Sequence, residues 1–339
     1  MKRNNTEQYY IGVDIGTTAL KGVLINSRAE VLAEYAVVNE LNFGANGRVE
    51  FDAEQRYHAL GTVTRALTAA VPCDVSALAM AAASGNTLLC DQHGKPSGPA
   101  ISWMDQRCVY NPPYKLTAFN ESDVRETIGW PCIKTFPLAH LAWLHENASE
   151  RFHSAAHIGM DTDWLAHRLT GLWALDHSSA TTFHLRNQRN GSYHQPYLNQ
   201  LEIAPEKLST LMCSGEIIGA LTAQAAHETG LSEQTMLVSG CFDHPAAARA
   251  AGVLKPGELL LSCGTSWVGF LPHPDRAALI KARLLCDPFL SAHGGPWAGM
   301  FSVPQIGRNI DWYVEHLIAP GEKVSERMRS FDSMAASVA

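Results

Sequence analysis

A chain of 339 residues is longer than one hydrophobic core usually serves, so we expect two domains. Hydrophobic residues make up 46% and charged residues 17%, a globular balance, and a net charge of −7 without a basic stripe argues against a nucleic-acid partner. The first apolar run, from Tyr9, is interrupted by Asp14, which predicts neither a secretory signal nor a membrane span and favours a cytoplasmic location.

The N-terminal part of the chain predicts an antiparallel sheet followed by a helix. Apolar runs at 9–13, 20–25 and 31–38 are separated by short turns, as in consecutive hairpins. Asp52 can cap a helix whose apolar residues recur at helical spacing. The apolar run at 75–83 then predicts a buried strand.

The rest of the chain predicts short strands alternating with helices. Residues 183–200, rich in Asn, Gln, Gly and His, predict a loop. A strand–turn–strand pattern with Gly-Thr at its turn appears at 9–25 and again at 259–270, which suggests one such hairpin in each of two domains. The remaining expected elements are strands at 88–90, 100–103, 236–239, 259–262 and 267–270, and helices at 138–146, 160–168, 220–229 and 245–251.

Cysteines and histidines give little sign of a metal centre. The eight cysteines include no Cys-X-X-Cys pair, which predicts reduced thiols without a structural zinc site. His153 and His157 lie four residues apart, as on one helix face, but no third ligand is near them in the sequence. We therefore interpret both as ordinary surface histidines.

The segment from Asp14 to Thr18 fits a phosphate-binding turn. Gly16 allows the backbone to approach an anion, and the hydroxyls of Thr17 and Thr18 add donors. A carboxylate at Asp14 suits a phosphate site only if Mg²⁺ lies between the two, and Lys21 adds positive charge. The alternative is an ordinary hairpin turn with polar residues.

A second polar turn and a carboxylate complete the pattern. Gly264, Thr265 and Ser266 lie between two apolar strands, in the same setting as the first turn. Asp243 follows a strand and precedes Pro245, so it either caps the next helix or accepts a proton from a substrate hydroxyl beside a cleft.

The segment from Trp103 to Arg107 suits a polyol ligand. The Trp103 ring can cover a C–H face while Asp105 and Arg107 bond to hydroxyls. The alternative is a core tryptophan beside a surface ion pair.

These motifs occur in the order seen in FGGY carbohydrate kinases, which the chain resembles from about Tyr9 to its end. The segments 163–171 and 215–219 add to this resemblance. The resemblance implies an α/β fold of two ribonuclease-H-like domains of the actin and sugar-kinase type with a cleft between them. The first domain would span 1–235, and 236–339 would form the first part of an incomplete second domain.

The resemblance also implies roles for individual residues. ATP and Mg²⁺ would be the cofactors, with Asp14 on the metal, and a small sugar or polyol would be the substrate. The phosphate-binding residues would be Asp14, Gly16, Thr17, Thr18, Lys21, Gly264, Thr265 and Ser266. Asp243 would be the general base and would contact the sugar together with Asn86, Trp103, Asp105 and Arg107.

In the family the chain continues well past the segment that 333–339 resembles, into a glycine-rich turn that holds adenosine. We therefore expect an exposed apolar face on the second sheet and weak or no ATP-dependent turnover by this chain alone. The alternatives are a non-catalytic sugar-binding remnant and another ATPase of the same superfamily, acetate-kinase-like or chaperone-like. The sequence His244-Pro245, with Arg249 one turn on, leaves the sugar unassigned, and a homodimer stays open.

Overall fold

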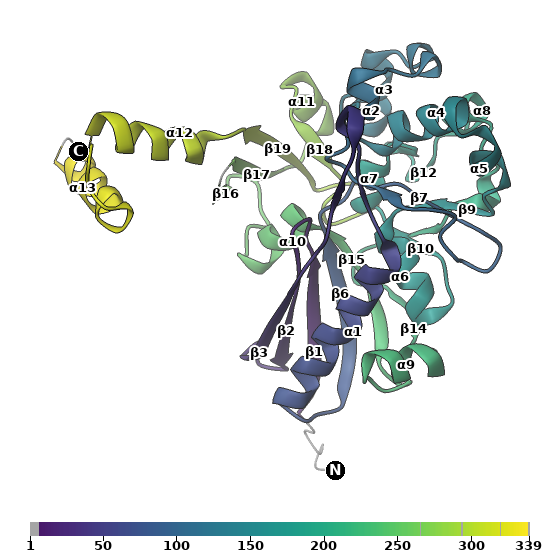
Figure 1. The fold of residues 1–339 in the computed structure, drawn as a ribbon, viewed down its shortest axis with the longest axis horizontal. Helices are drawn as coiled ribbons and strands as arrows, with labels where there is room; N and C mark the ends of the chain where they lie inside the picture. Colours follow the sequence, from purple (N-terminus) through teal and green to yellow (C-terminus); the bar gives the residue numbers. More distant parts are fainter. Residues whose placement is uncertain (1–6, 265, 293, 319, 338–339) are drawn as a thin grey trace.

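The computed structural model describes residues 7–264, 266–292, 294–318 and 320–337. Its body combines two sheets with a large helical region, and a helical arm extends from one side (Figure 1). Among the described residues, none of the helices combines the length and apolar character that crossing a membrane requires.

The first sheet has six strands in the order β14-β15-β6-β1-β2-β3. The expected hairpins are confirmed, since β1 pairs antiparallel with β2 and β2 with β3, while β6 runs parallel to both β1 and β15. These strands are β1 (Tyr9–Ile15), β2 (Ala19–Asn26), β3 (Val31–Val38), β6 (Val75–Ala82), β14 (Ile217–Ala220) and β15 (Met236–Phe242).

Helix α1 (Ala53–Ala70) covers one face of this sheet. As expected, Asp52 caps it by accepting a 2.9 Å hydrogen bond from Glu54 N. The helix approaches β2 closely because position 22 is glycine; a Cβ there would lie 2.4 Å from the Val63 side chain. Burial of Val63 and Leu67 between helix and sheet contributes to the first core.

The region between β6 and β14 is mainly helical. The expected loop at 183–200 is wrong in part, because it contains β11 (Arg186–Asn187), β12 (Ser192–Tyr193) and most of α8 (Gln195–Leu201). Tyr197, Leu198 and Leu201 of α8 are buried in the second core, so packing outweighs the polar composition. The helices are α2 (Arg107–Tyr110), α3 (Glu121–Ile128), α4 (Pro137–Asn147), α5 (Ser149–Ser154), α6 (Asp161–Thr170), α7 (Ser179–Phe183) and α8 (Gln195–Leu201), with α9 (Ala223–Thr229) after β14.

Short strands and 3₁₀ turns connect these helices. The small sheets pair β4 with β5 and β8, β7 with β9, β10 with β13, and β11 with β12. The strands are β4 (Asn42–Phe43), β5 (Val49–Phe51), β7 (Leu88–Cys90), β8 (Ala100–Ile101), β9 (His157–Gly159), β10 (Ala174–Asp176), β11 (Arg186–Asn187), β12 (Ser192–Tyr193) and β13 (Thr210–Met212). The 3₁₀ turns are η1 (Ala45–Gly47), η2 (Tyr114–Ala118) and η3 (Pro205–Lys207).

The second sheet is antiparallel, in the order β16-β17-β19-β18. It shares a core with the helical region, because Phe270, Phe289 and Met300 pack in the same cluster as the residues of α4 and α8. Its elements, with the helix that leads into it, are α10 (Asp243–Ala250), β16 (Leu260–Cys263), β17 (Trp267–His273), α11 (Arg276–Lys281), β18 (Leu285–Asp287) and β19 (Trp297–Val303).

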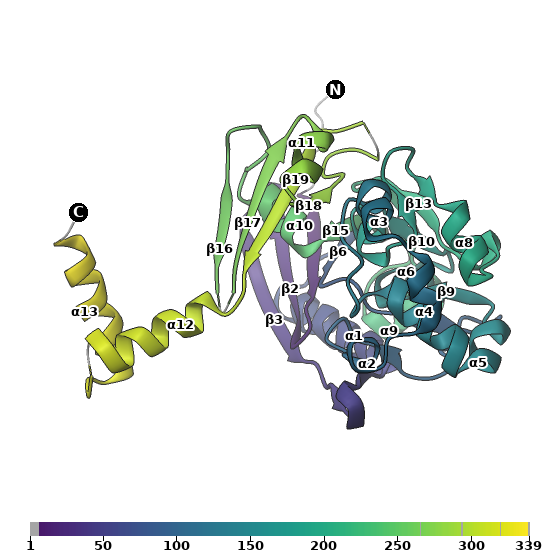
Figure 2. The ribbon, with the colours of Figure 1, turned by 90° about the horizontal axis from the view of Figure 1, so that it is seen from above.

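A helical arm follows β19 and leaves the body, as Figure 2 shows from above. It comprises α12 (Ile306–Tyr313), the π-helical turn η4 (Val314–Ile318) and α13 (Val324–Ala336). Trp312 and Leu317 of the arm are exposed, as are Leu261 of β16 and Val303 of β19, in line with the apolar exposure expected for this part of the chain.

The division of the chain at residue 235 stays a prediction. Strand β15 pairs with β6 and β14 inside the first sheet, and α10 packs on β15. This pairing favours a division that comes after α10.

Candidate functional site

Asp243 is the first residue of α10, directly after the end of β15. Its carboxylate accepts a 2.7 Å hydrogen bond from His244 N, and its side chain is 33% exposed. Burial raises the pKa of Asp243, and the negative charge of Asp14 adds to the rise, while His244 opposes it. The residue therefore starts the helix rather than capping it from outside, and it keeps lone pairs for a ligand.

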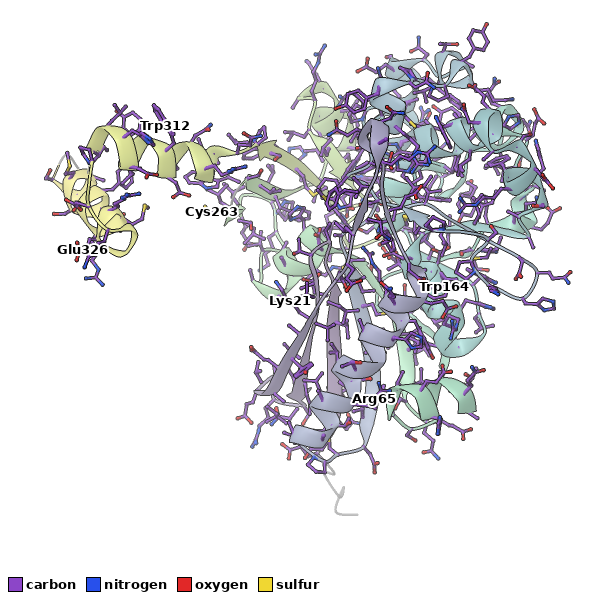
Figure 3. The ribbon with its side chains drawn as sticks, in the orientation of Figure 1. Lys21, Arg65, Trp164, Cys263, Trp312 and Glu326 are labelled. Atoms are coloured by element: carbon purple, nitrogen blue, oxygen red, sulfur yellow. The ribbon has the colours of Figure 1, made fainter. Side chains whose placement is uncertain are left out.

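Asp243 lines a cavity of about 740 Å³ between the first sheet and α10. The cavity also contains Asp14 of β1 and Lys21 of β2, which face each other across the strand pair, and Figure 3 labels Lys21. Its walls are formed largely by small residues of the strands and of α10, which leaves the charged groups accessible. These small residues are Gly12, Ala79, Ala81, Gly240, Ala246, Ala247 and Ala250.

Asp14 fits a hard cation such as Mg²⁺. No hydrogen-bond donor is recorded for its carboxylate in the part of the chain that the structure describes. Burial raises the pKa of Asp14, and Lys21 partly offsets this rise. An unsatisfied carboxylate oxygen beside a cavity is a ligand that Mg²⁺ prefers.

The turn at Gly16 to Thr18 directs its carbonyl groups toward Asn39. Asn39 Nδ2 donates to Gly16 O at 2.7 Å, and Asn39 N donates to Thr18 O at 2.9 Å. Within the described ranges, no acceptor is recorded for the N–H groups of residues 16–18. The turn therefore has backbone donors to offer an anion.

The second polar turn is only partly described. Gly264 N donates to Ser266 O at 3.3 Å, and Ser266 Oγ accepts from Gln305 N at 3.2 Å. Thr265 lies outside the described residues. Neither Gly264 nor Ser266 lines the cavity that contains Asp243, so a joint phosphate site made of both turns stays a prediction.

Trp103 connects the predicted sugar segment to the first turn. Its indole Nε1 donates to Thr17 Oγ1 at 2.8 Å, and its side chain is 37% exposed. Asn86 holds the Trp103 backbone by accepting from Trp103 N at 3.0 Å, and it donates to Asp161 at 2.9 Å. Asn86 is 1% exposed, so its role in this structure is to hold Trp103 in place rather than to contact a ligand.

Asp105 and Arg107 form a buried pair instead of an open ligand site. The carboxylate of Asp105 accepts from Arg107 N, Nε and a terminal guanidinium nitrogen at 2.8–2.9 Å, and from Val49 N at 2.7 Å. Arg107 also pairs with Glu50 at 2.5 Å. Burial alone would raise the pKa of Asp105, but these hydrogen bonds outweigh it and hold the pKa below its ordinary value. Their contact with sugar stays a prediction that this geometry does not support.

Sequence reasoning did not assign His244 and Arg249 to the site, but both line the cavity. His244 Nε2 lies 4.0 Å from Asp243 Oδ1, and Arg249 donates to the carbonyl of Phe289 beyond β18. Spacing along the helix could not have assigned them, because His244 is one residue and Arg249 six residues from Asp243, and only residues three or four apart share a helix face.

The two histidines read as a surface pair are placed differently. His153 lies on α5 and is exposed, whereas His157 lies on β9 and is buried against the Trp173 ring, with 3.5 Å between ring centroids. The two therefore share no helix face, because the helix ends at Ser154.

Comparisons with known proteins agree with the expected family. A family model for the N-terminal domain of the FGGY family of carbohydrate kinases matches residues 9–249. The chain is 24% identical over 335 residues to the xylulose kinase of Bacillus subtilis (strain 168), covering 96% of this chain and 65% of that protein. It is 25% identical over 297 residues to the gluconokinase of the same organism, covering 85% and 57%. The chain thus spans less than two thirds of the length of these two relatives.

Solved structures show the same fold. The xylulose kinase from Rhodospirillum rubrum superposes with a TM-score of 0.88 at 23% identity, covering 97% of this chain and 67% of that one. The gluconate kinase from Lactobacillus acidophilus superposes with a TM-score of 0.86 at 20% identity, covering 98% and 66%. At these identities the likeness establishes the arrangement of the chain and leaves the substrate open.

Proposed function

The chain belongs to the FGGY family of carbohydrate kinases, and from that premise we propose that it transfers a phosphoryl group from ATP to a hydroxyl of a small sugar or polyol. The observation that carries this proposal is the shared cavity of Asp14, Lys21 and Asp243, in which two carboxylates with raised pKa lie beside a cation. We propose likewise that the two sheets belong to two ribonuclease-H-like domains flanking this cleft.

In this proposal Asp243 is the general base. It would accept the proton of the attacking hydroxyl as the oxygen approaches phosphorus, which needs an ionised carboxylate with free lone pairs. Burial raises the pKa of Asp243 above the ordinary value for aspartate, which makes the ionised carboxylate a better proton acceptor. The small residues around it leave room for the acceptor molecule.

ATP and Mg²⁺ would be held by groups on the first sheet. Asp14 would coordinate Mg²⁺, which neutralises charge on the transferred phosphoryl group when bound. Lys21 and the N–H groups of residues 16–18 would contact phosphate oxygens. Gly264, Thr265 and Ser266 stay a proposed second contact. Trp103 would cover the sugar and keep the first turn in place through Thr17.

The names of the two curated relatives, a xylulose kinase and a gluconokinase, suggest the class of acceptor. We propose a small ketose, polyol or sugar acid, a cytoplasmic location, and no nucleic-acid or membrane partner. Because these relatives are longer than this chain, activity of the chain by itself is the part of the proposal most in need of a test.

The test is a coupled assay of ADP release with Mg²⁺-ATP and a panel of pentuloses, hexuloses, polyols and sugar acids. Wild type runs beside Asp243→Ala and beside Asp74→Asn, an exposed aspartate before β6 that serves as matched control. Turnover that depends on one acceptor, persists in Asp74→Asn and disappears in Asp243→Ala supports the proposal.

Calorimetry with the same panel separates the two remaining outcomes. Sugar binding without ADP release would favour the alternative of a sugar-binding chain without phosphoryl transfer. If no acceptor in the panel is bound and none supports ADP release, both the proposed phosphoryl transfer and the alternative of a sugar-binding chain are contradicted.

A further inference from the structure

A cluster of metal-binding side chains lies on the helical region, away from the cavity of Asp243. It comprises His145 of α4, His153 of α5 and Glu202, the residue that follows α8. In Figure 1 these three helices lie on the side of the body opposite the helical arm. The sequence hides this cluster, because its members are up to 57 residues apart, from 145 to 202.

The geometry is close to that of a tetrahedral metal site. One ligand atom from each residue lies within 4.8 Å of the others, and His145 Nε2 lies 3.1 Å from Glu202 Oε1. Metal–ligand distances of about 2.0–2.1 Å in a tetrahedron separate neighbouring ligand atoms by roughly 3.3 Å. His145 and Glu202 therefore already have the required spacing, and the exposed His153 ring would have to approach them by at most about 1.5 Å.

His145 has a nitrogen that the protein itself leaves unused. Its Nε2 atom is buried and, although near Glu202, is not aligned for a hydrogen bond within the described chain. The rings of His145 and His153 are in edge-to-face contact, with 5.0 Å between their centroids and an angle of 75° between their planes, so the two imidazoles lie side by side. Burial of an unpaired imidazole nitrogen costs free energy unless a ligand uses it.

Glu202 is held in place as an anion. Lys115 Nζ lies 3.1 Å from Glu202 Oε1 and also donates to Gln200 O at 3.3 Å. His145 Nε2 lies 3.1 Å from the same carboxylate oxygen, so Glu202 is positioned by two nitrogen groups. Lys115 provides the positive charge beside Glu202 in this structure. When a metal ion binds, the Lys115 side chain would have to move away from the carboxylate.

We propose that His145, His153 and Glu202 bind a divalent transition-metal ion of the zinc type, which joins α4, α5 and the end of α8. Two imidazoles and one carboxylate suit Zn²⁺, with a water as fourth ligand, and suit Mg²⁺ or Ca²⁺ poorly. The ion would stabilise the helical region, because it would add a connection between three helices at the edge of their shared apolar core.

The test is calorimetry of the untagged, reduced protein with ZnCl₂, and with MgCl₂ as comparison. We expect one Zn²⁺ per chain and a rise in Tm on its addition. His153→Ala and Glu202→Gln, both of exposed residues, should weaken binding by at least about tenfold and abolish the rise in Tm. His93→Ala, a matched exposed histidine outside the cluster, should change neither.

Two further results sharpen the test. Lys115→Met should tighten Zn²⁺ binding by about fivefold, because it removes a competing charge next to Glu202. Co²⁺ bound in place of Zn²⁺ should lack the near-ultraviolet absorption of a thiolate ligand. Zn²⁺ affinity unchanged in both His153→Ala and Glu202→Gln, or a thiolate band with Co²⁺, would overturn the proposal.

Discussion

Two aspartates, both predicted from the sequence as site residues, have opposite surroundings in this molecule. Asp105 is fully buried and accepts four hydrogen bonds, from Arg107 and Val49 N, and its pKa is held below the ordinary value. Asp243 accepts a backbone hydrogen bond from His244, lines a large cavity, and has a raised pKa. Both were predicted site residues, but only Asp243 keeps lone pairs for a ligand.

The difference shows what makes a carboxylate available for chemistry. A carboxylate whose oxygens are filled by internal donors stabilises a fold, because desolvation is offset by charge-assisted hydrogen bonds. A carboxylate beside small residues keeps its desolvation cost, which a substrate or metal ion can relieve. The residue type is the same in both cases, and the neighbouring hydrogen-bond donors decide the role.

Loss of the Asp105 carboxylate should have the largest effect on stability. Asp105→Ala leaves the buried guanidinium of Arg107 with Glu50 as its remaining partner and orphans Val49 N. We expect the free energy of unfolding to fall by about 3–5 kcal/mol, measured by urea denaturation. Glu50→Ala, at a more exposed position, should cost clearly less, and a cost below about 1 kcal/mol for Asp105→Ala would contradict the structural role.

A smaller effect is expected where the sugar segment meets the first turn. Trp103→Phe keeps an aromatic ring but removes the hydrogen bond from Nε1 to Thr17 Oγ1. The free energy of unfolding should fall by about 1 kcal/mol in the same urea assay. Trp312→Phe, an exposed position on the arm, is the matched control and should have no measurable effect. Equal effects of the two substitutions would argue against the contact.

The smallest expected effect is a gain in stability, on removal of the Asp243 charge, where loss of the Asp105 charge should destabilise the fold. Folding raises the pKa of Asp243, so the folded protein binds a proton at this carboxylate more tightly than the unfolded chain does. The free energy of unfolding therefore falls as the pH rises from the pKa of an unfolded aspartate, about 3.9, through the raised pKa of the folded state. Asp243→Asn should therefore raise Tm at pH 7–8, and the gain should shrink toward pH 4. Thermal unfolding across this range checks it, and a lower Tm at pH 7–8 would show that the carboxylate is satisfied internally.

Much of the fold could be predicted because its elements depend on patterns of neighbouring residues in the sequence. The opening hairpins and the Asp52 cap follow from apolar alternation and a capping side chain. Helix α8 could not be read from its polar composition, because the burial of Tyr197, Leu198 and Leu201 depends on distant partners.

The candidate site was predictable in part for the same reason. Asp14, Lys21 and Asp243 were recognised from turns at strand ends, and the structure places them in one cavity. The satisfaction of Asp105 by Val49 N, 56 residues away, is a long-range contact with no local signal. The metal cluster of His145, His153 and Glu202 is another such case.

The most direct test of the account replaces one carboxylate of the cavity and one carboxylate that pairs with Arg107 by the corresponding amide. Acceptor-dependent ADP release is measured for Asp243→Asn and Glu50→Gln, with circular dichroism as a check of folding. The account predicts that Asp243→Asn lowers the rate of ADP release by at least about 100-fold, because general-base catalysis is removed. Calorimetry should show that this variant still binds the acceptor. Glu50→Gln should release ADP at nearly the wild-type rate. Turnover of Asp243→Asn within about tenfold of wild type would contradict the assignment of Asp243 as the base.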